Sequence, residues 1–296
     1  MNKRTAYKGF NADWTCRGFQ FEVGKTYEHE GDVRICGEGF HACENPMDVW
    51  RYYGPFDVKY AVVSLEGETD KESKGDSKIA AGKITIEAEL SAGEFVKKCV
   101  DWLISATKGA SEDGGRSTRI GSSGDHAQIG SSGYYTKIGS SGRFTRIGSS
   151  GHGAQIGSSG HGARIGSSGE YAQIGSSGDH AHIGSSGHGA RIGSSGYGAR
   201  IGSSGYYTQI GSSGEYAQIG SSGDDTKIDV SGEGSVVASA GCNSKVRGQE
   251  GTWVSLAEYD ENGDCKGFAS GCIGKDGLKH DVWYKAEGGK LVPSDY

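Results

Sequence analysis

The residues with the clearest capacity for chemistry stand in the first third of the chain, where three cysteines and a histidine occur. Cys16, Cys36, His41 and Cys43 are of the types that bind Zn²⁺. The Cys-x4-His-x-Cys spacing of the last three matches no common zinc knuckle, and small buried thiols are the commoner reason for such residues. We therefore expect no metal ligand among them and no bound cofactor.

The same histidine belongs to a second candidate constellation. His41 precedes a segment that bears Tyr52 and Tyr53. Three glutamates later in the chain could supply an acid: Glu87, Glu89 and Glu94. This set loosely resembles the histidine, stacking ring and late glutamate of ADP-ribosyltransferases. Because the spacing is unconstrained, and a structural histidine beside core aromatics is the commoner arrangement, we expect no catalytic residues and keep this enzyme as an alternative.

The middle of the chain is organised by a nine-residue repeat. Twelve copies that each contain Ile-Gly-Ser-Ser-Gly run from Ile120 to about Lys227, and their isoleucines recur every nine residues. We number the unit from Ile (position 1) through Gly-Ser-Ser-Gly (positions 2–5) and two variable residues (6 and 7). Ala or Thr follows at position 8, and a mostly basic or amide residue at position 9. Such an array predicts a stacked solenoid.

The unit also predicts the geometry of each coil. The small residue at position 8 and the Ile two residues later share one face of a short strand, so both should point inward. Gly-Ser-Ser-Gly suits a tight turn. Nine residues cannot enclose a core, so we pair two units into an eighteen-residue coil with two parallel strands, a flattened β-roll. Roughly six coils at about 4.8 Å would make a rod of about 30 Å. A three-unit coil of twenty-seven residues stays open.

One variable column favours the eighteen-residue period. At position 7 of every second unit, tyrosine alternates with glycine, so that an aromatic residue and glycine follow each other eighteen residues apart: Tyr135, Gly153, Tyr171, Gly189 and Tyr207. Each tyrosine could lie across the glycine rungs beside it, because large residues alternate with small ones in packed layers.

Calcium binding is the usual function of a Gly-rich nonapeptide roll, which holds the ion through an Asp at a fixed place in the turn. Here Asp125, Asp179 and Asp224 are scattered at position 6 among Tyr, Arg and His residues. Calcium requires about six to eight oxygen ligands, several of them charged. We therefore expect the roll to hold no calcium.

The variable positions instead form a mixed basic, amide and aromatic surface, which is typical of protein recognition. Residues 119–227 contain eight Lys or Arg and six Asp or Glu, hence plus two, against minus six for the whole chain. That charge is weak for a nucleic-acid clamp, so nucleic acid is the less favoured partner. Solvated faces of a rod are the structural alternative. The candidate binding residues are Tyr134, Arg146, Arg164, Tyr171, Arg191, Tyr197, Arg200, Tyr206 and Tyr216.

The parts on either side of the repeats have ordinary composition. We expect a mainly β protein with an α+β head domain over 1–105, the nonapeptide-repeat β-solenoid over 106–241 and a β-meander cap over 242–296. The start lacks an apolar segment, and no run approaches about eighteen apolar residues, which predicts no membrane association and a cytoplasmic location. Seven cysteines, an odd number, favour reduced thiols.

Local signals predict elements in the head and cap. Head strands are expected near 33–36, 58–65 and 78–88. Asn45-Pro46 predicts one helix start, and Ser91 with Glu94 forms a capping box for a second helix, which should cover the first coil. In the cap, Asn262-Gly263 predicts a hairpin turn, and Trp253 and Trp283 should cover the last coil.

Three motifs resemble a domain found in phage and prophage proteins of unassigned function: Lys8-Gly9-Phe10, Cys16-Arg17-Gly18-Phe19-Gln20 and Gly39-Phe40-His41-Ala42-Cys43. Members of that group often have Gly-rich repeats, and their ends resemble Leu256-Ala257-Glu258-Tyr259-Asp260 and Asp281-Val282-Trp283-Tyr284-Lys285. The resemblance implies a mobile-element origin and brings no known catalytic residues.

These observations predict a non-enzymatic phage or prophage protein that binds a host macromolecule, most simply a host protein, through the rigid rod. Inhibition of a bacterial defence or of another host protein would suit such a surface. A virion structural or fibre component, which should form stable trimers, is one alternative, and the ADP-ribosyltransferase is the other. The aromatic-rich cap could also serve self-association.

Overall fold

The computed structural model describes residues 3–54, 58–71, 76–107 and 117–295. The chain is mainly β, with 47% strand and 8% helix, as the sequence predicted. It divides into two compact units, Met1–Trp102 and Leu103–Tyr296, which are described separately. Neither helix in the described ranges is long and apolar enough to cross a lipid bilayer.

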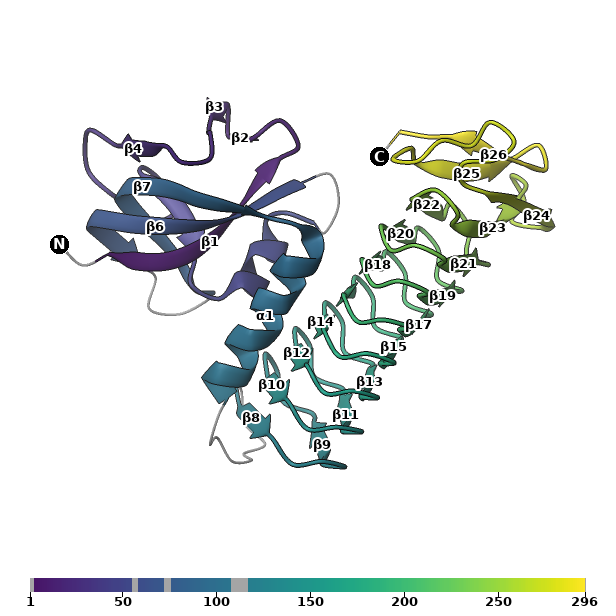
Figure 1. Ribbon diagram of the computed structural model, residues 1–296, viewed down its shortest axis with the longest axis horizontal. Helices are drawn as coiled ribbons and strands as arrows, with labels where there is room; N and C mark the ends of the chain where they lie inside the picture. Colours follow the sequence, from purple (N-terminus) through teal and green to yellow (C-terminus); the bar gives the residue numbers. More distant parts are fainter. Residues whose placement is uncertain (1–2, 55–57, 72–75, 108–116, 296) are drawn as a thin grey trace. The chain divides into compact units, whose positions relative to one another are not determined.

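The head unit is built around a closed antiparallel ring of strands. Its strand order is β4-β7-β5-β1-β6, and β7 also pairs with β6, which closes the ring (Figure 1). A separate short hairpin joins β2 and β3. The strands are β1 (Arg4–Asn11), β2 (Thr15–Cys16), β3 (Phe19–Gln20), β4 (Thr26–Glu28), β5 (Phe40–Cys43), β6 (Val58–Lys71) and β7 (Lys78–Leu90).

Apolar side chains of the head strands fill the inside of this ring. Phe10, Leu65, Ile79 and Ile84 are fully buried, and Phe21 joins them from outside the strands. Burial of such side chains provides most of the stabilisation that a unit of this size can obtain, about 1.5–3 kcal/mol for each. The ring therefore supplies a rigid support for the loops and short strands at its surface.

Two helices flank the head strands. The 3₁₀ helix η1 (Pro46–Arg51) begins at Asn45, whose side chain accepts a hydrogen bond of 3.1 Å from the amide of Met47. The helix α1 (Ala92–Thr107) has the predicted capping box, because the Ser91 amide donates to Glu94 at 2.8 Å. The strand expected at 33–36 was wrong: these residues form a turn closed by Gly37 N–H and Arg34 C=O at 3.0 Å.

The solenoid has two strands per coil, and each strand pairs in parallel with the strand eighteen residues away. Lys137 aligns with Gln155 in one sheet, and Arg146 with Arg164 in the other. This register confirms the eighteen-residue coil and excludes the coil of twenty-seven residues. About eight coils run over residues 119–256, so the solenoid extends beyond the expected boundary at 241.

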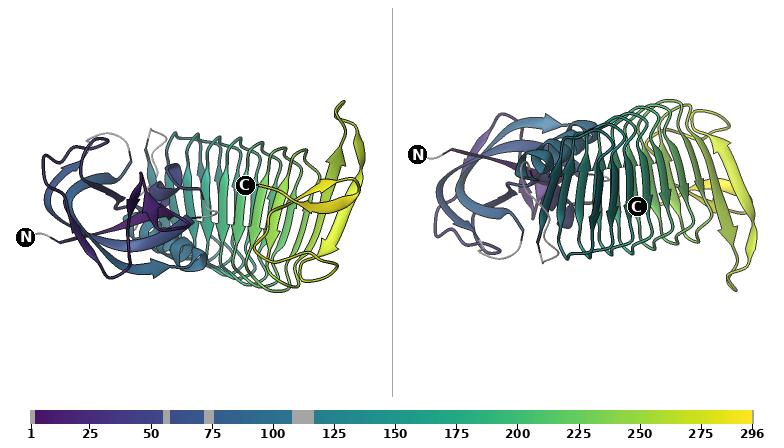
Figure 2. Two further views of the ribbon diagram at one scale, coloured as in Figure 1. Left: turned by 90° about the horizontal axis from the view of Figure 1, so that it is seen from above. Right: turned by 90° about the horizontal axis from the view of Figure 1, so that it is seen from below.

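The two solenoid sheets alternate along the chain, and Figure 2 shows successive strands of a sheet side by side. We call them the even sheet and the odd sheet after their strand numbers. The even sheet contains β8 (Arg119–Ser122), β10 (Lys137–Ser140), β12 (Gln155–Ser158), β14 (Gln173–Ser176), β16 (Arg191–Ser194), β18 (Gln209–Ser212), β20 (Lys227–Val230) and β22 (Lys245–Gly248). The odd sheet contains β9 (Gln128–Ser131), β11 (Arg146–Ser149), β13 (Arg164–Ser167), β15 (His182–Ser185), β17 (Arg200–Ser203), β19 (Gln218–Ser221), β21 (Val236–Ser239) and β23 (Trp253–Tyr259).

Positions 1, 3 and 8 point into the coil. The isoleucines form one continuous apolar column, and the position-8 residues are buried with them. Where position 8 is Thr, it accepts a hydrogen bond from the position-3 serine, as Thr208 does from Ser203 at 3.0 Å. In seven of the units where position 8 is Ala, the serine hydroxyl is buried and has no hydrogen-bond partner among the described residues: Ser149, Ser158, Ser167, Ser176, Ser185, Ser194 and Ser212.

Both ends of the solenoid are closed. The last turn of α1 packs on the first coils of the even sheet, and a Cβ at Gly139 would lie 2.9 Å from the Ile104 Cα, so glycine is required there. At the other end, β24 (Cys265–Cys272) pairs antiparallel with β23 across the Asn262-Gly263 turn. The hairpin of β25 (Tyr284–Glu287) and β26 (Lys290–Pro293) extends the even sheet beyond β22. These hairpins occupy edges that would otherwise be free to pair.

Candidate functional site

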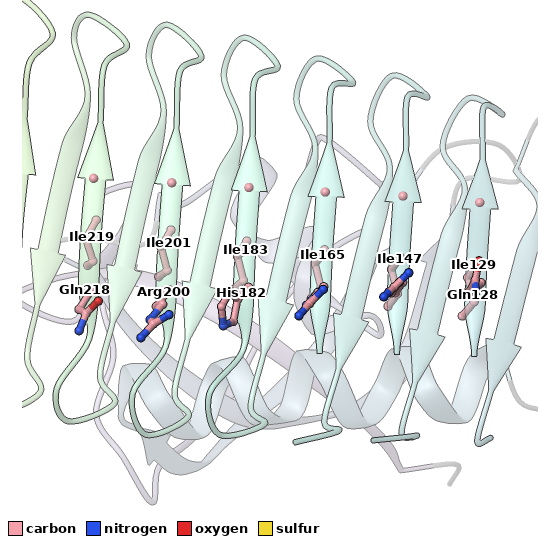
Figure 3. Close-up of a pocket in the computed structure, with 18 of the residues that line it drawn as sticks. Gln128, Ile129, Ile147, Ile165, His182, Ile183, Arg200, Ile201, Gln218 and Ile219 are labelled. Atoms are coloured by element: carbon pink, nitrogen blue, oxygen red, sulfur yellow. The ribbon is translucent and has the colours of Figure 1, made fainter. Parts of the chain in front are cut away.

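The outer face of the odd sheet has a long shallow groove floored by glycine. Position 2 is Gly in the six strands from β9 to β19, and its missing side chain leaves the middle of each strand bare. At Gly130, Gly148, Gly166, Gly202 and Gly220, nothing lies within 4 Å of the place where a Cβ would stand. The groove has a volume of about 1410 Å³ and spans these strands (Figure 3).

A basic row forms one wall of this glycine groove. Arg146, Arg164, His182 and Arg200 occupy position 9 of successive strands and align in register. Figure 3 shows Gln128 and Gln218 continuing the row at either end. Neighbouring strands lie about 4.8 Å apart, so the adjacent guanidinium groups of Arg146 and Arg164 repel one another. No residue of β9, β11, β13, β15, β17 or β19 is acidic.

His182 is the titratable member of the row. Burial lowers its pKa below the ordinary 6.5, and the nearby Arg200 and Arg164 charges lower it further. The imidazole is therefore neutral at neutral pH, and the row has three fixed positive charges from arginine together with one that appears only in acid.

Serines border the glycine floor on its other side, where they line an adjoining hollow. The outward serines of position 4, among them Ser150, Ser168, Ser186 and Ser204, run along the glycine floor opposite the basic row. Their hydroxyl groups can donate and accept hydrogen bonds. A chain lying in the groove would meet cationic side chains on one side, bare backbone below and hydroxyls on the other side.

Aromatic ladders run along both edges of the solenoid, where the turns are. Each position 7 has a positive φ, from 52° at Asp225 to 67° at Gly162. When position 7 is Gly, the ring comes from position 6 of the same turn. One ladder contains His126, Phe144, His161, His180, Tyr197 and Tyr216, with ring centroids 5.3–5.6 Å apart. The other contains Tyr135, His152, Tyr171, His188 and Tyr207, at 5.4–5.7 Å.

These ladders explain the alternation of tyrosine and glycine at position 7. A Cβ at Gly153 would lie 2.7 Å from the Tyr135 ring, and one at Gly189 would lie 2.8 Å from the Tyr171 ring. Tyr135 and Tyr171 therefore each cover the glycine of the next coil, as the sequence predicted, and a side chain at Gly153 or Gly189 would displace the ring. The ring–ring contacts add about 0.5–1.5 kcal/mol each beyond the buried area.

The nine candidate binding residues lie on four different surfaces. Arg146, Arg164 and Arg200 come together in the basic row of the odd sheet, whereas Arg191 lies in the even sheet, where it donates to Gln209 at 3.2 Å. One edge has Tyr134, Tyr171 and Tyr206, and the other has Tyr197 and Tyr216. His182, absent from that set, completes the basic row, and an eighteen-residue spacing from Arg164 and Arg200 was the signal that could have identified it.

The position-6 aspartates are part of the stack itself. Asp125 accepts a hydrogen bond of 2.8 Å from the Arg143 amide, and Asp179 accepts one of 2.9 Å from the Tyr197 amide. Asp224 does the same for the Cys242 amide at 2.7 Å. Within the described residues, no three His, Cys, Asp or Glu side chains gather to hold a metal ion. Each carboxylate therefore links its turn to the next coil.

A second hollow lies within the head unit. This head cavity of about 590 Å³ is lined by Cys16, Cys36, Cys43 and His41, together with Tyr52 and Tyr53 and the cations Lys8, Arg17 and Lys78. His41 and the two tyrosines thus come together as the enzyme alternative requires. The three candidate acids do not line the cavity: Glu87 pairs with Lys3, Glu89 with Lys59, and Glu94 with Ser91. All seven cysteines are free thiols.

Comparison with known proteins assigns only the head. Residues 4–98 match the model of a family described as a domain of unknown function, DUF7666. No curated protein matches the chain, and no solved structure matches it. The match agrees with the resemblance to proteins of unassigned function, and it ends before the repeats begin.

Proposed function

We propose that this chain is a non-enzymatic phage or prophage protein that binds an acidic, extended segment of a bacterial host protein in the glycine groove of the odd sheet. The proposal rests on one observation: an open glycine floor runs beside a basic row in strands without a single carboxylate. Binding of this kind in the host cytoplasm would block the activity of the host protein, for example a defence factor.

The dimensions of the groove suit an extended chain. Six strands at about 4.8 Å span about 24 Å, which corresponds to about seven extended residues at 3.3 Å each. Glycine allows a backbone to approach the sheet closely, because no Cβ intervenes. The serines that border the other side of the glycine floor can then satisfy polar groups of the bound segment.

The charges favour an acidic protein segment over nucleic acid. The basic row is flanked at both edges of the solenoid by carboxylates, including Asp179 and Glu215 at one edge and Glu170 and Asp224 at the other. A nucleic acid wider than the groove would bring its phosphates toward these acids. A narrow acidic peptide would meet the arginines and avoid the edges.

The direct test uses a fluorescent acidic peptide of eight residues, a neutral peptide of the same length and single-stranded DNA, with anisotropy as the readout. The variant Arg146→Gln, Arg164→Gln, Arg200→Gln removes the fixed charges with a residue that the column already contains at Gln128. Exposed ion pairs contribute about 0.2–1 kcal/mol each, so the three changes should weaken peptide binding about 3-fold to 150-fold. The control Arg143→Gln, Lys266→Gln, Lys290→Gln removes equal charge from exposed sites elsewhere.

Three outcomes decide the proposal. Loss of peptide binding in the groove variant and retention in the control would support it, and a purified host protein that binds wild type but not the groove variant would name the partner. Equal peptide binding by the groove variant and the wild type would refute it. Tighter binding of DNA than of the acidic peptide would replace the protein partner with nucleic acid.

A further inference from the structure

The head cavity is lined by positive charge that no lining carboxylate balances. Lys8 on β1, Arg17 in the β2–β3 hairpin and Lys78 on β7 all line it, and none of its lining residues is Asp or Glu. Two carboxylates contact lining residues from outside the cavity: Asp76 accepts hydrogen bonds from the Tyr52 hydroxyl and the Lys78 amide, and Glu38 lies 3.6 Å from His29. The cavity therefore provides an electropositive environment for a ligand.

Lys8 is the most unusual of these cations because it is buried. Only 7% of the residue is exposed. Its ammonium donates to the His41 carbonyl at 2.9 Å and to the Cys16 sulfur at 3.4 Å, and it lies 5.4 and 5.6 Å from the rings of Phe10 and Phe21. Buried charges are normally paired with an opposite charge. Burial accordingly lowers the pKa of Lys8, and an anion in the cavity would reverse that shift.

His41 offers a further polar group to a ligand. Its Nε2 is buried and has no hydrogen-bond partner among the described residues. Burial lowers the pKa of this imidazole, and the charges of Lys8, Arg17 and Lys78 lower it further. The ring is thus neutral in the free protein, and an anion close to it would favour the protonated form.

Aromatic rings form the remaining wall. Phe19 is 45% exposed although it packs edge-on against Phe40 at 5.9 Å, and Tyr52 is 49% exposed. Tyr53 donates to the Cys16 sulfur at 2.9 Å. Exposed rings beside a cationic hollow suit a planar group, because aromatic faces stack on nucleobases. A volume of about 590 Å³ is in the range of small-molecule sites.

We propose that the head cavity binds a nucleotide, with its phosphate held by Lys8, Arg17 and Lys78 and its base stacked on the exposed aromatic wall that contains Phe19 and Tyr52. This site is separate from the groove of the odd sheet and does not depend on the function proposed for it.

The test measures binding of AMP, ATP, adenosine and inorganic phosphate to the full chain by calorimetry. Lys78→Gln and Arg17→Gln should each weaken nucleotide binding at least 10-fold. Lys83→Gln is the matched control, because Lys83 lies on the same strand, pairs with Glu28 and does not line the cavity. Lys8→Met should abolish binding while the head stays folded, since methionine replaces a buried cation with an apolar chain of similar length.

Adenosine should bind at least 10-fold more weakly than AMP, and AMP should raise the pKa of His41 in an NMR titration. Absence of binding by both AMP and ATP would overturn the proposal. Unchanged AMP affinity in Arg17→Gln would overturn it as well, and because Arg17 is exposed, this substitution should leave the fold of the head intact. Inorganic phosphate that binds as tightly as AMP would overturn the assignment of the aromatic wall to a base.

Discussion

Glycine at position 5 should be the least replaceable residue of the repeat, and Gly160→Ala measures this. Gly160 lies in the turn between β12 and β13, directly above Gly142 of the preceding coil. A Cβ at Gly160 would lie 2.6 Å from the carbonyl carbon of Gly142 and nearer still to its oxygen. Two carbon atoms pack at about 3.5–4.0 Å, so the coils would have to separate by about 1 Å.

The hydrogen bonds on either side of this contact set the energetic cost. The Ser159 amide donates to the Ser140 carbonyl at 3.0 Å, and the Phe144 amide donates to the His161 carbonyl at 2.9 Å. A separation of about 1 Å would take both beyond hydrogen-bond length. With about 1 kcal/mol for each lost bond and some residual strain, we expect Gly160→Ala to lower the free energy of unfolding by about 2–4 kcal/mol.

Gly166→Ala is the matched control in the neighbouring strand. Its Cβ would meet nothing within 4 Å, and alanine in a strand is about 0.5–1 kcal/mol more favourable than glycine. Urea unfolding followed by circular dichroism should therefore move the two midpoints in opposite directions. Equal midpoints for the two variants would refute the packing argument, as would a Gly160→Ala protein as stable as wild type.

Three further outcomes follow from single residues. Ala172→Thr should raise the free energy of unfolding by about 1 kcal/mol, because the new hydroxyl would accept a hydrogen bond from Ser167, as Thr208 does from Ser203. Ala172→Val adds no hydroxyl and should not raise it. Urea unfolding measures both variants. Tyr171→Gly should be about 1 kcal/mol more stable than Tyr171→Ala in the same assay, since φ is 54° there and glycine alone adopts it freely. Because burial lowers the pKa of His182 from 6.5, its positive charge appears only in acid. Acidic-peptide affinity should therefore rise between about pH 7 and pH 5, and His182→Gln should reduce that rise.

The solenoid was predictable because its information is local and repeated. The isoleucine period implied an inward column, and the Tyr135–Gly153 alternation implied the eighteen-residue coil. The last coil was missed because Val246 and Val254 continue the column after the Gly-Ser-Ser-Gly has disappeared. Trp253 was expected to cover that coil, yet it is 53% exposed. Trp283 is buried, and the guanidinium carbon of Arg247 lies over its ring, 4.9 Å from the ring centroid.

The head was less predictable because its contacts are distant in sequence. The head cavity is lined by three cations that are far apart in the sequence, Lys8, Arg17 and Lys78. They line one cavity because β1, β5 and β7 are neighbours in the ring, and the spacing of residues along the sequence does not reveal this strand order. The turn at 33–36 has the composition of a strand, but Asp70 accepts a hydrogen bond of 2.8 Å from the Ile35 amide and holds it outside the sheet. Of the four arginines that the sequence nominated as candidate binding residues, three share one row of the odd sheet, and Arg191 lies in the even sheet because consecutive units alternate between sheets.

Consecutive nine-residue units contribute strands to the two sheets in turn, and this alternation limits how the gene for this protein can change in length. Loss of a single unit between Arg164 and His182 would transfer every later residue to the opposite sheet, because consecutive units alternate between sheets. Arg200 would leave the basic row, and both edge ladders would exchange their rings. Recombination between repeats therefore preserves the surface only when it adds or removes units in pairs. The DNA repeats every nine codons, but the smallest change in length that keeps each later residue in its sheet is eighteen codons.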